Sequence, residues 1–374
     1  MSFFRDFHNE INWDCRIIGI LGQKGVGKST LILQHIKKYE DASKALYVSA
    51  DDIYFTAHTL IDTAKKFFAE GGKVLYIDEI HKYGGWSTEV KLMYDQLRLL
   101  KVVYSGSSIL DLKKGGADLS RRAIEYRMPA WSFREYLNLR QGWNLKKATI
   151  EDILKGNVDF PYGEHRPLAY FKEYKKEGCY PFFDEPEFRT RLRQVITTTV
   201  ELDIPKYAEM TVAATDKLKK LMYYIAQSVP VKINYSDMKR DLGIPRNSLP
   251  QYLEYLEKAE LVCTLKKKAN GDAALRKMDK LYLDNPNMMY ALSETEPNVG
   301  NIRKTMFLCW MKRSHTVLES PVSDFEIDGK TFEVGGRKKG KKQIADVTDG
   351  YVVADDIEYA FQNKLPIWMF GFIY

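Results

Sequence analysis

A glycine-rich segment near the N-terminus constrains the fold of this chain more than any other feature. It is the sequence Gly-Gln-Lys-Gly-Val-Gly-Lys-Ser-Thr at residues 22–30, which fits the pattern G-x-x-x-x-G-K-[S/T]. An almost wholly apolar run, Arg16 to Leu21, precedes it, and a helical pattern from Leu31 to Ile36 follows it. Short apolar runs of this kind are typical of parallel strands covered on both faces. The order strand, glycine loop, helix predicts an α/β fold built on a parallel sheet.

The residue types in this loop suit a bound nucleoside triphosphate. Glycines let the backbone turn its N–H groups toward phosphate oxygens, and the N-terminus of the following helix adds partial positive charge. We expect Lys28 to reach the β- and γ-phosphates and the Ser29 hydroxyl to ligate Mg²⁺. The predicted ATP-binding residues are Gly22, Gln23, Lys24, Gly25, Val26, Gly27, Lys28, Ser29 and Thr30.

A pair of adjacent carboxylates ends another apolar run about 50 residues after the loop. The run Val74 to Ile77 leads directly into Asp78 and Glu79. We expect Asp78, together with Ser29, to hold Mg²⁺ and its water shell, and Glu79 to activate the attacking water as a general base. The alternative is an ordinary strand that ends in two solvated acids. The position of the pair after a phosphate-binding loop favours the catalytic interpretation.

Other polar residues are candidates for sensing the γ-phosphate. Ser105 and Ser107 follow a strand pattern at 101–105 and could orient the lytic water, although both could simply belong to a hydroxyl-rich turn. Arg122, or Arg121 as the second choice, precedes the short strand pattern 124–128. From there an arginine could stabilise the transition state in a neighbouring copy, and a solvated charge pair is the alternative.

The ordered motifs GQKGVGKST, LYIDEIHKYGGW, VVYSGSS, SRRAIEYRM and WSFREYL resemble AAA+ ATPases of the bacterial and archaeal type. The resemblance covers nearly the whole chain. It implies a P-loop core with a five-stranded parallel sheet, in which an inserted strand separates the Walker B strand from the P-loop strand. It also implies ATP and Mg²⁺ as cofactors, Arg122 as the arginine finger, and a histidine, His81, beside Walker B that relays the nucleotide state or packs on the surface.

The resemblance further implies the order of the domains. We expect an AAA+ ATPase core at 1–140, a helical lid at 141–205, a winged helix-turn-helix at 206–283 and a degenerate α/β domain related to PD-(D/E)xK restriction endonucleases at 284–374. The length of 374 residues allows several domains.

The pattern of residues 232–283 independently indicates a winged helix. Two helical patterns flank Gly243-Ile244-Pro245, and two strand patterns flank Asn270-Gly271, a hairpin signal. The second helix begins with side chains that can reach DNA, and basic residues gather in the expected wing at 262–282. Contact with a protein is the alternative. The side chains concerned are Arg246, Asn247, Ser248, Gln251, Lys266, Lys267, Lys268, Arg276, Lys277 and Lys280.

The C-terminal region has the acids of a nuclease but not its lysine. Asp324 or Asp328, with Glu333, could hold a metal ion, but the lysine expected two residues after Glu333 is Gly335. Lys338 could replace it only with a shifted register. We therefore expect a domain that does not cut. The basic run 336–342 is expected to be exposed, either as a solvated loop or in contact with a phosphate backbone.

Composition narrows the class of protein. The net charge of +7 permits an anionic partner, and the four cysteines are too scattered for a zinc ribbon. No apolar run is long enough to span a membrane, so we expect a cytoplasmic protein, with the apolar tail 366–374 forming a buried strand. We expect Mg²⁺-dependent ATP hydrolysis coupled to a module that contacts DNA or protein, in a possible homo-oligomer. The alternatives are a slow nucleotide-gated switch or an ATPase-coupled nuclease.

Overall fold

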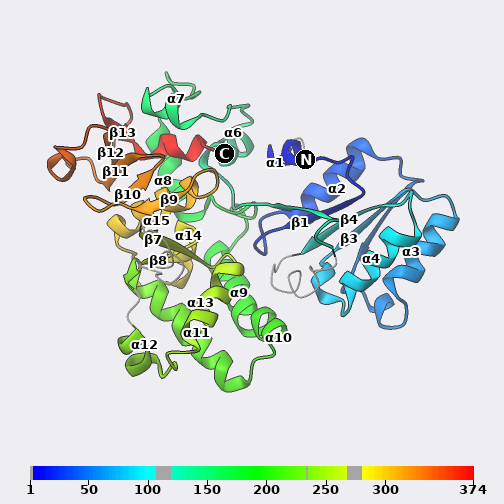
Figure 1. Ribbon diagram of the computed structural model, residues 1–374. Helices are drawn as coiled ribbons and strands as arrows, with labels where there is room; N and C mark the ends of the chain where they lie inside the picture. The colour runs from blue at the N-terminus through cyan, green and yellow to red at the C-terminus, as the bar shows by residue number, and fades with distance from the viewer. Residues whose placement is uncertain (1–2, 107–118, 233–234, 268–279) are drawn as a thin grey trace. The chain divides into compact units, whose positions relative to one another are not determined.

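The computed structural model describes residues 3–106, 119–232, 235–267 and 280–374, which divide into two compact units. The first unit is Met1–Pro129 together with Leu202–Glu209, and the second is Ala130–Glu201 with Met210–Tyr374 (Figure 1). A short segment far along the chain therefore belongs to the first unit. In the described part of the chain, no helix is both long and apolar enough to cross a membrane.

The first unit is built on a five-stranded parallel sheet with the order β2-β3-β4-β1-β5. β4 lies between β1 and β3, as the inserted strand of the sequence-based prediction requires. The predicted α/β fold with a five-stranded parallel sheet is therefore confirmed for the first unit. The strands are β1 (Ile17–Leu21), β2 (Ala45–Ser49), β3 (Val74–Asp78), β4 (Lys101–Gly106) and β5 (Ile124–Arg127).

Helices cover both faces of this sheet. Figure 1 shows α2 on one face and α3 and α4 on the other. α2 begins directly after Gly27, which adopts a left-handed conformation with φ of 102° that glycine tolerates best. The helices of this unit are α1 (Phe7–Glu10), α2 (Lys28–Tyr39), α3 (Leu60–Ala69), α4 (Trp86–Gln96) and α10 (Ile204–Ala208).

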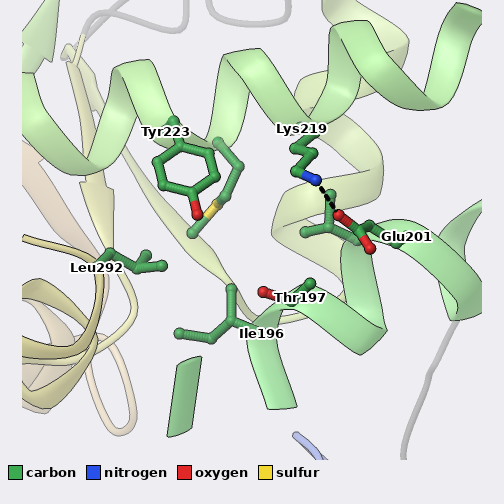
Figure 2. A pocket seen from close by; sticks show the side chains of 8 residues that line it. Ile196, Thr197, Glu201, Lys219, Tyr223 and Leu292 are labelled. Atoms are coloured by element: carbon green, nitrogen blue, oxygen red, sulfur yellow. Dashed lines mark ion pairs between the residues drawn. The ribbon is translucent and has the colours of Figure 1, made fainter. Parts of the chain in front are cut away.

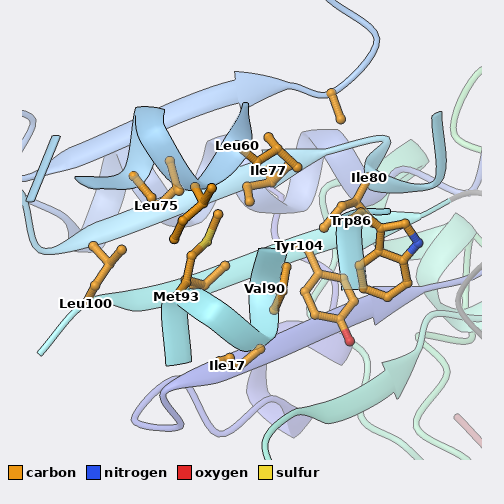
Figure 3. Close-up of a cluster of buried hydrophobic side chains, with 14 of the residues drawn as sticks. Ile17, Leu60, Leu75, Ile77, Ile80, Trp86, Val90, Met93, Leu100 and Tyr104 are labelled. Carbon is orange, nitrogen blue, oxygen red and sulfur yellow. The ribbon is translucent and has the colours of Figure 1, made fainter. Parts of the chain in front are cut away.

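A buried apolar cluster joins the sheet to α3 and α4 (Figure 3). Ile77 of β3 and Tyr104 of β4 contribute to it from the sheet, and Trp86 and Val90 contribute from α4. Burial of such side chains is worth about 1.5–3 kcal/mol each. The cluster therefore fixes the strands against one another, and it fixes the edge of the sheet at which they end.

The second unit begins with helices. α6 starts at Phe133 because Ser132 and Glu135 form a capping box, in which each side chain accepts a hydrogen bond from the other's backbone N–H. The helices are α6 (Phe133–Gln141), α7 (Ile150–Leu154), α8 (Pro167–Glu177), α9 (Phe188–Thr198), α11 (Val212–Ser228), α12 (Tyr235–Leu242), α13 (Leu249–Lys258), α14 (Pro286–Leu292) and α15 (Val299–Met311).

An eight-stranded mixed sheet runs through the second unit in the order β13-β12-β11-β10-β9-β7-β8-β6. Pairing of β7 with β9 joins its two halves. The apolar tail is buried as expected, but the prediction that it forms a strand is wrong: a 3₁₀ helix spans Ile367–Phe372. The strands are β6 (Val231–Lys232), β7 (Val262–Lys267), β8 (Lys280–Leu283), β9 (Val317–Glu319), β10 (Phe325–Ile327), β11 (Lys330–Gly335), β12 (Gly350–Ala354) and β13 (Lys364–Pro366).

The core of the first unit leaves no room for a methyl group at Gly19. A Cβ there would lie 2.7 Å from the ring of Tyr104, which is fully buried. We expect Gly19→Ala to lower the free energy of unfolding by about 1–3 kcal/mol, because overpacking forces the ring to move. Urea unfolding measures the effect, with Gly84→Ala as the control, since nothing lies within 4 Å of a Cβ at Gly84. Equal midpoints for the two variants would contradict the packing described.

Candidate functional site

The glycine-rich loop connects the end of β1 to the start of α2. Gly22 must be glycine, because a Cβ there would lie 2.4 Å from the backbone oxygen of Met128. Lys28 is buried, and its Nζ donates to the carbonyl oxygens of Gly22 and Gln23 at 2.9 and 3.0 Å. The lysine ammonium is therefore held inside the loop, at the place from which it can exchange these carbonyls for phosphate oxygens.

Asp78, at the end of β3, accepts hydrogen bonds from three other elements. Tyr47 Oη of β2 donates to its Oδ2 at 2.6 Å, Ser105 Oγ of β4 donates to its Oδ1, and Ser29 of α2 also donates to it. The carboxyl is only 4% exposed. Burial acts to raise the pKa of Asp78, but the accepted hydrogen bonds outweigh burial and hold the pKa below its ordinary value. The carboxylate thus stays ionised and ready for a cation.

Glu79 follows Asp78 in a left-handed conformation with φ of 50°, which is unusual for a residue with a side chain. Its backbone N–H lies 3.3 Å from Ser105 Oγ, and its Oε2 lies 3.5 Å from Nε2 of His81. Burial raises the pKa of Glu79, which makes it a stronger base, and nearby Lys28 opposes that change. Burial lowers the pKa of His81 to about 4, so this imidazole is neutral near pH 7.

Two residues of this site were missed in the sequence. Tyr47 contacts Asp78 as described above, and Arg5 is buried with its Nη1 2.8 Å from the oxygen of Pro129 and 3.3 Å from that of Val26. Arg5 thereby ties the glycine-rich loop to the end of the unit. A buried arginine before the first strand is a weak signal, because nothing in the local sequence indicates its distant partners.

Arg122 lies apart from this cluster. Its Nε is 3.4 Å from Oδ1 of Asp95, and its guanidinium lies 5.6 Å from the centre of the Tyr94 ring. It precedes β5, which runs parallel to β1, so it stands at the amino end of the strands whereas the glycine-rich loop stands at the carboxyl end. Arg121 is exposed beside it, and Ser107 lies outside the described residues.

The comparisons with known proteins agree with this geometry. Residues 14–137 match the model of a family described as an AAA domain. Most of this match falls in the first unit. Residues 171–298 match a domain of unknown function, DUF8612. The AAA match includes the glycine-rich loop, Asp78 and Glu79, which supports a nucleotide-binding ATPase of the P-loop class.

Two more distant likenesses were found. An uncharacterized protein of Methanocaldococcus jannaschii is 27% identical over 285 residues, which are 71% of this chain and 60% of that protein. The chain thus spans 60% of the length of this curated relative. A chain of the S. cerevisiae Hsp104–ADP complex is 16% identical, with 68% of this chain and 38% of that chain covered and a TM-score of 0.31.

Beyond the AAA domain, the structure separates the two candidate acids of the C-terminal region. Asp324 precedes β10, and its Oδ2 accepts the N–H of Val334 at 3.0 Å, next to Glu333. Asp328 instead lies in the turn between β10 and β11, where its Oδ2 is 2.7 Å from Nδ1 of His315. Asp324, and not Asp328, therefore neighbours Glu333.

The lysine beside Glu333 is Lys339, whereas the sequence had suggested Lys338. Lys339 Nζ forms an ion pair with Glu333, and Lys304 Nζ forms one with Asp324. A Cβ on Gly335 would lie 2.6–2.9 Å from the stem of Lys339. The glycine that stands where a nuclease has its lysine thus makes room for a lysine from further along the chain.

The candidate DNA-contacting residues are only partly described. Arg246, Asn247 and Gln251 are exposed around the start of α13, and Lys266 and Lys267 are exposed at the end of β7. Ser248 stands at the N-cap of α13 without a capping hydrogen bond from its side chain. Lys280 pairs with Glu319 at 2.7 Å. Lys268, Arg276 and Lys277 lie outside the described residues.

A pocket in the second unit lies between α9, α11 and Leu292 (Figure 2). Most of its wall is apolar, and its charged groups, Glu201 and Lys219, form an ion pair with each other. It therefore offers little to a phosphate, and its lining includes no residue of the glycine-rich loop or of the acid pair. Its lining residues are Ile196, Thr197, Val200, Glu201, Lys219, Met222, Tyr223 and Leu292.

The low pKa of His81 predicts a loss of stability in mild acid. Below pH 6.5 the unfolded chain takes up a proton at this imidazole, whereas the folded chain does not until about pH 4. Stability therefore falls as the pH drops from 6.5 to 4, by up to about 3 kcal/mol from this residue. His81→Gln should flatten that fall in urea titrations at several pH values. His35, whose pKa is also lowered to about 4 by burial, supplies a remaining slope in the variant. An unchanged slope would contradict a neutral, buried His81.

Proposed function

We propose that this chain is a Mg²⁺-dependent AAA+ ATPase whose hydrolysis is coupled to a C-terminal module that contacts nucleic acid or protein. The observation that carries this proposal is the convergence of Ser29, Asp78 and Glu79 beside the ammonium of Lys28. These groups come from the start of α2 and the end of β3, and they meet at the carboxyl edge of the sheet, where ligands of parallel α/β folds bind.

Each residue has a specific task in this proposal. The Ser29 hydroxyl and the Asp78 carboxylate would hold Mg²⁺, which neutralises phosphate charge when it is bound. Lys28 binds the β- and γ-phosphates. Glu79 accepts a proton from the attacking water, and its raised pKa suits that role. Ser105, which bonds Asp78 and lies near the N–H of Glu79, keeps both acids in position.

A continuous set of contacts supports coupling to the rest of the chain. His81 lies beside Glu79, and the next residue, Lys82, forms an ion pair with Asp203 at 2.9 Å. Asp203 belongs to the segment Leu202–Glu209, whose two ends continue directly into the second unit. A change in the charge around Glu79 on hydrolysis can therefore affect, through His81 and Lys82, a segment that is covalently joined to the second unit at both ends.

We propose that residues 206–283 form a winged helix. The element order α11, β6, α12, α13, β7, β8 supports this, as does the pairing of β8 with both β6 and β7. The remaining assignments, an ATPase core at 1–140, a lid at 141–205 and a nuclease-like domain at 284–374, are proposals of the same kind. Pairing of β7 with β9 joins the proposed winged helix and the proposed nuclease-like domain in one sheet.

We expect Glu79→Gln to bind ATP but to hydrolyse it at least about 100-fold more slowly, because the amide cannot accept the proton. Phosphate release measures hydrolysis, and nucleotide binding is measured separately. Glu70→Gln is the matched control, since Glu70 is an exposed carboxylate of the same unit. Wild-type turnover in Glu79→Gln would contradict the proposed base.

The position of Arg122 predicts a second copy at the nucleotide site. Because it stands at the opposite edge of the sheet from Lys28, it can reach a γ-phosphate only in a neighbouring subunit. We expect Arg122→Ala and Lys28→Ala to be inactive alone. An equimolar mixture should regain part of the activity, since Lys28→Ala subunits supply the arginine and Arg122→Ala subunits supply the binding loop.

Mass measurement of the mixture is the control for this experiment. It must show that the two variants assemble together in the presence of ATP. Mixed assemblies without any recovered hydrolysis would contradict the assignment of Arg122 as an arginine finger acting between subunits.

A further inference from the structure

The loop at 336–342, which we call the basic loop, presents a dense set of cations. Arg337, Lys338, Lys341 and Lys342 are all exposed, and none of these four forms an ion pair with another described residue. Asp346 and Asp349 are the only acids in the rest of this connection, which ends where β12 begins at Gly350. The connection therefore carries five cations against two carboxylates.

Contacts on its inner side hold the basic loop in a fixed shape. Lys339 turns inward over Gly335 to pair with Glu333, and its Nζ also donates to Gln343 at 2.9 Å. Lys364, at the start of β13, donates to the backbone oxygens of Arg337 and Lys339 at 2.7 and 3.0 Å. A loop organised in this way loses less conformational entropy on binding a ligand than a mobile tail would.

Two exposed aromatic rings belong to the segment that precedes Lys364, the residue that holds the basic loop. Phe361 is 73% exposed, and its backbone pairs with that of Lys364 through hydrogen bonds of 2.9 and 3.0 Å, next to the lysine that holds the loop. Tyr359, two residues earlier, is 55% exposed and packs against Tyr162 with ring centroids 5.2 Å apart. Exposed rings and exposed cations together are the groups that proteins use to stack bases and contact phosphates.

The carboxylates near the basic loop already form ion pairs with basic side chains. Glu333 pairs with Lys339 and Asp324 with Lys304, while Asp355 pairs with both Lys175 and Arg303. In the described part of the chain, no cluster of three or more His, Cys, Asp or Glu side chains could hold a metal ion. The surface charge is therefore that of the exposed cations, which favours contact with an anion over cleavage of one.

We propose that the basic loop and the rings of Phe361 and Tyr359 bind single-stranded nucleic acid. Phosphates contact the four exposed cations, and bases stack on the two rings, the combination by which proteins bind single strands without reading their sequence. A duplex hides the faces of its bases, so it can use the cations but not the rings. The proposal narrows the nucleic-acid contact of the proposed function to one surface and one form of polymer.

The test is binding of a fluorescent 20-nucleotide oligo-dT to the full chain, measured by anisotropy without ATP. Two variants probe the surface: Phe361→Ala, and a quadruple variant with Arg337, Lys338, Lys341 and Lys342 all changed to Ala. The matched control changes four exposed lysines of the same unit to Ala and so loses the same charge. These are Lys146, Lys155, Lys172 and Lys220.

We expect the quadruple variant to lose binding and to reduce the salt-dependence slope by up to about 3, while the control keeps both. Phe361→Ala should bind oligo-dT about 5- to 100-fold more weakly and leave binding of a 20-base-pair duplex unchanged. Circular dichroism confirms that each variant is folded.

Three outcomes would overturn the proposal. They are no oligo-dT binding at low salt, equal loss in the control variant, or no effect of Phe361→Ala on the single strand. Binding of anionic phosphatidylserine vesicles without oligo-dT binding would assign the surface to membranes instead. The binding assay contains no ATP, so its outcome is independent of hydrolysis. Oligo-dT binding by a chain without ATPase activity would support this proposal and contradict the proposed ATPase. ATPase activity without oligo-dT binding would support the proposed ATPase and contradict this proposal.

Discussion

The hydrogen bonds that converge on the Asp78 carboxylate are the constraint on which the site depends. They join β2, β3, β4 and the start of α2 at one edge of the parallel sheet. A buried carboxylate without partners would be costly and would take up a proton. Its partners instead keep it ionised, and they fix the distance between the glycine-rich loop and the strand that carries Glu79.

In the first unit, different groups lie at the two ends of the parallel strands. The proposed phosphate-binding groups gather at the carboxyl edge of the strands, whereas Arg122 precedes the amino end of β5 and pairs with Asp95. In the proposed function, this edge binds the nucleotide and a second copy supplies Arg122. Lys82, three residues after Glu79, forms an ion pair with Asp203, which belongs to the segment Leu202–Glu209.

The convergence of the glycine-rich loop and the acid pair could be predicted from sequence, because each is a short motif with local geometry. The glycine loop and the acid pair each follow an apolar strand, and parallel strands bring both to one edge. Tyr47 and Arg5 could not be predicted in this way, since their roles depend on strand pairing and on contacts with residues 31 and 124 positions away, Asp78 and Pro129.

The contacts of the C-terminal region were also difficult to predict from sequence, because they depend on how distant parts of the chain fold together. The sequence showed that Gly335 replaces a lysine, but which lysine approaches Glu333 depends on how the following loop folds back. Lys364 fixes that path through the backbone of the loop, so Lys339 turns inward and Lys338 outward. The apolar tail was correctly expected to be buried, but apolar runs alone do not distinguish a strand from a 3₁₀ helix.

Calorimetric titration of ATP with and without Mg²⁺, on the wild type and on Asp78→Asn, tests the central claim most directly. If Asp78 and Ser29 hold the metal, Mg²⁺ strengthens ATP binding in the wild type, and Asp78→Asn loses most of that gain while binding metal-free ATP as before. An equal effect of Mg²⁺ on both proteins would contradict the account.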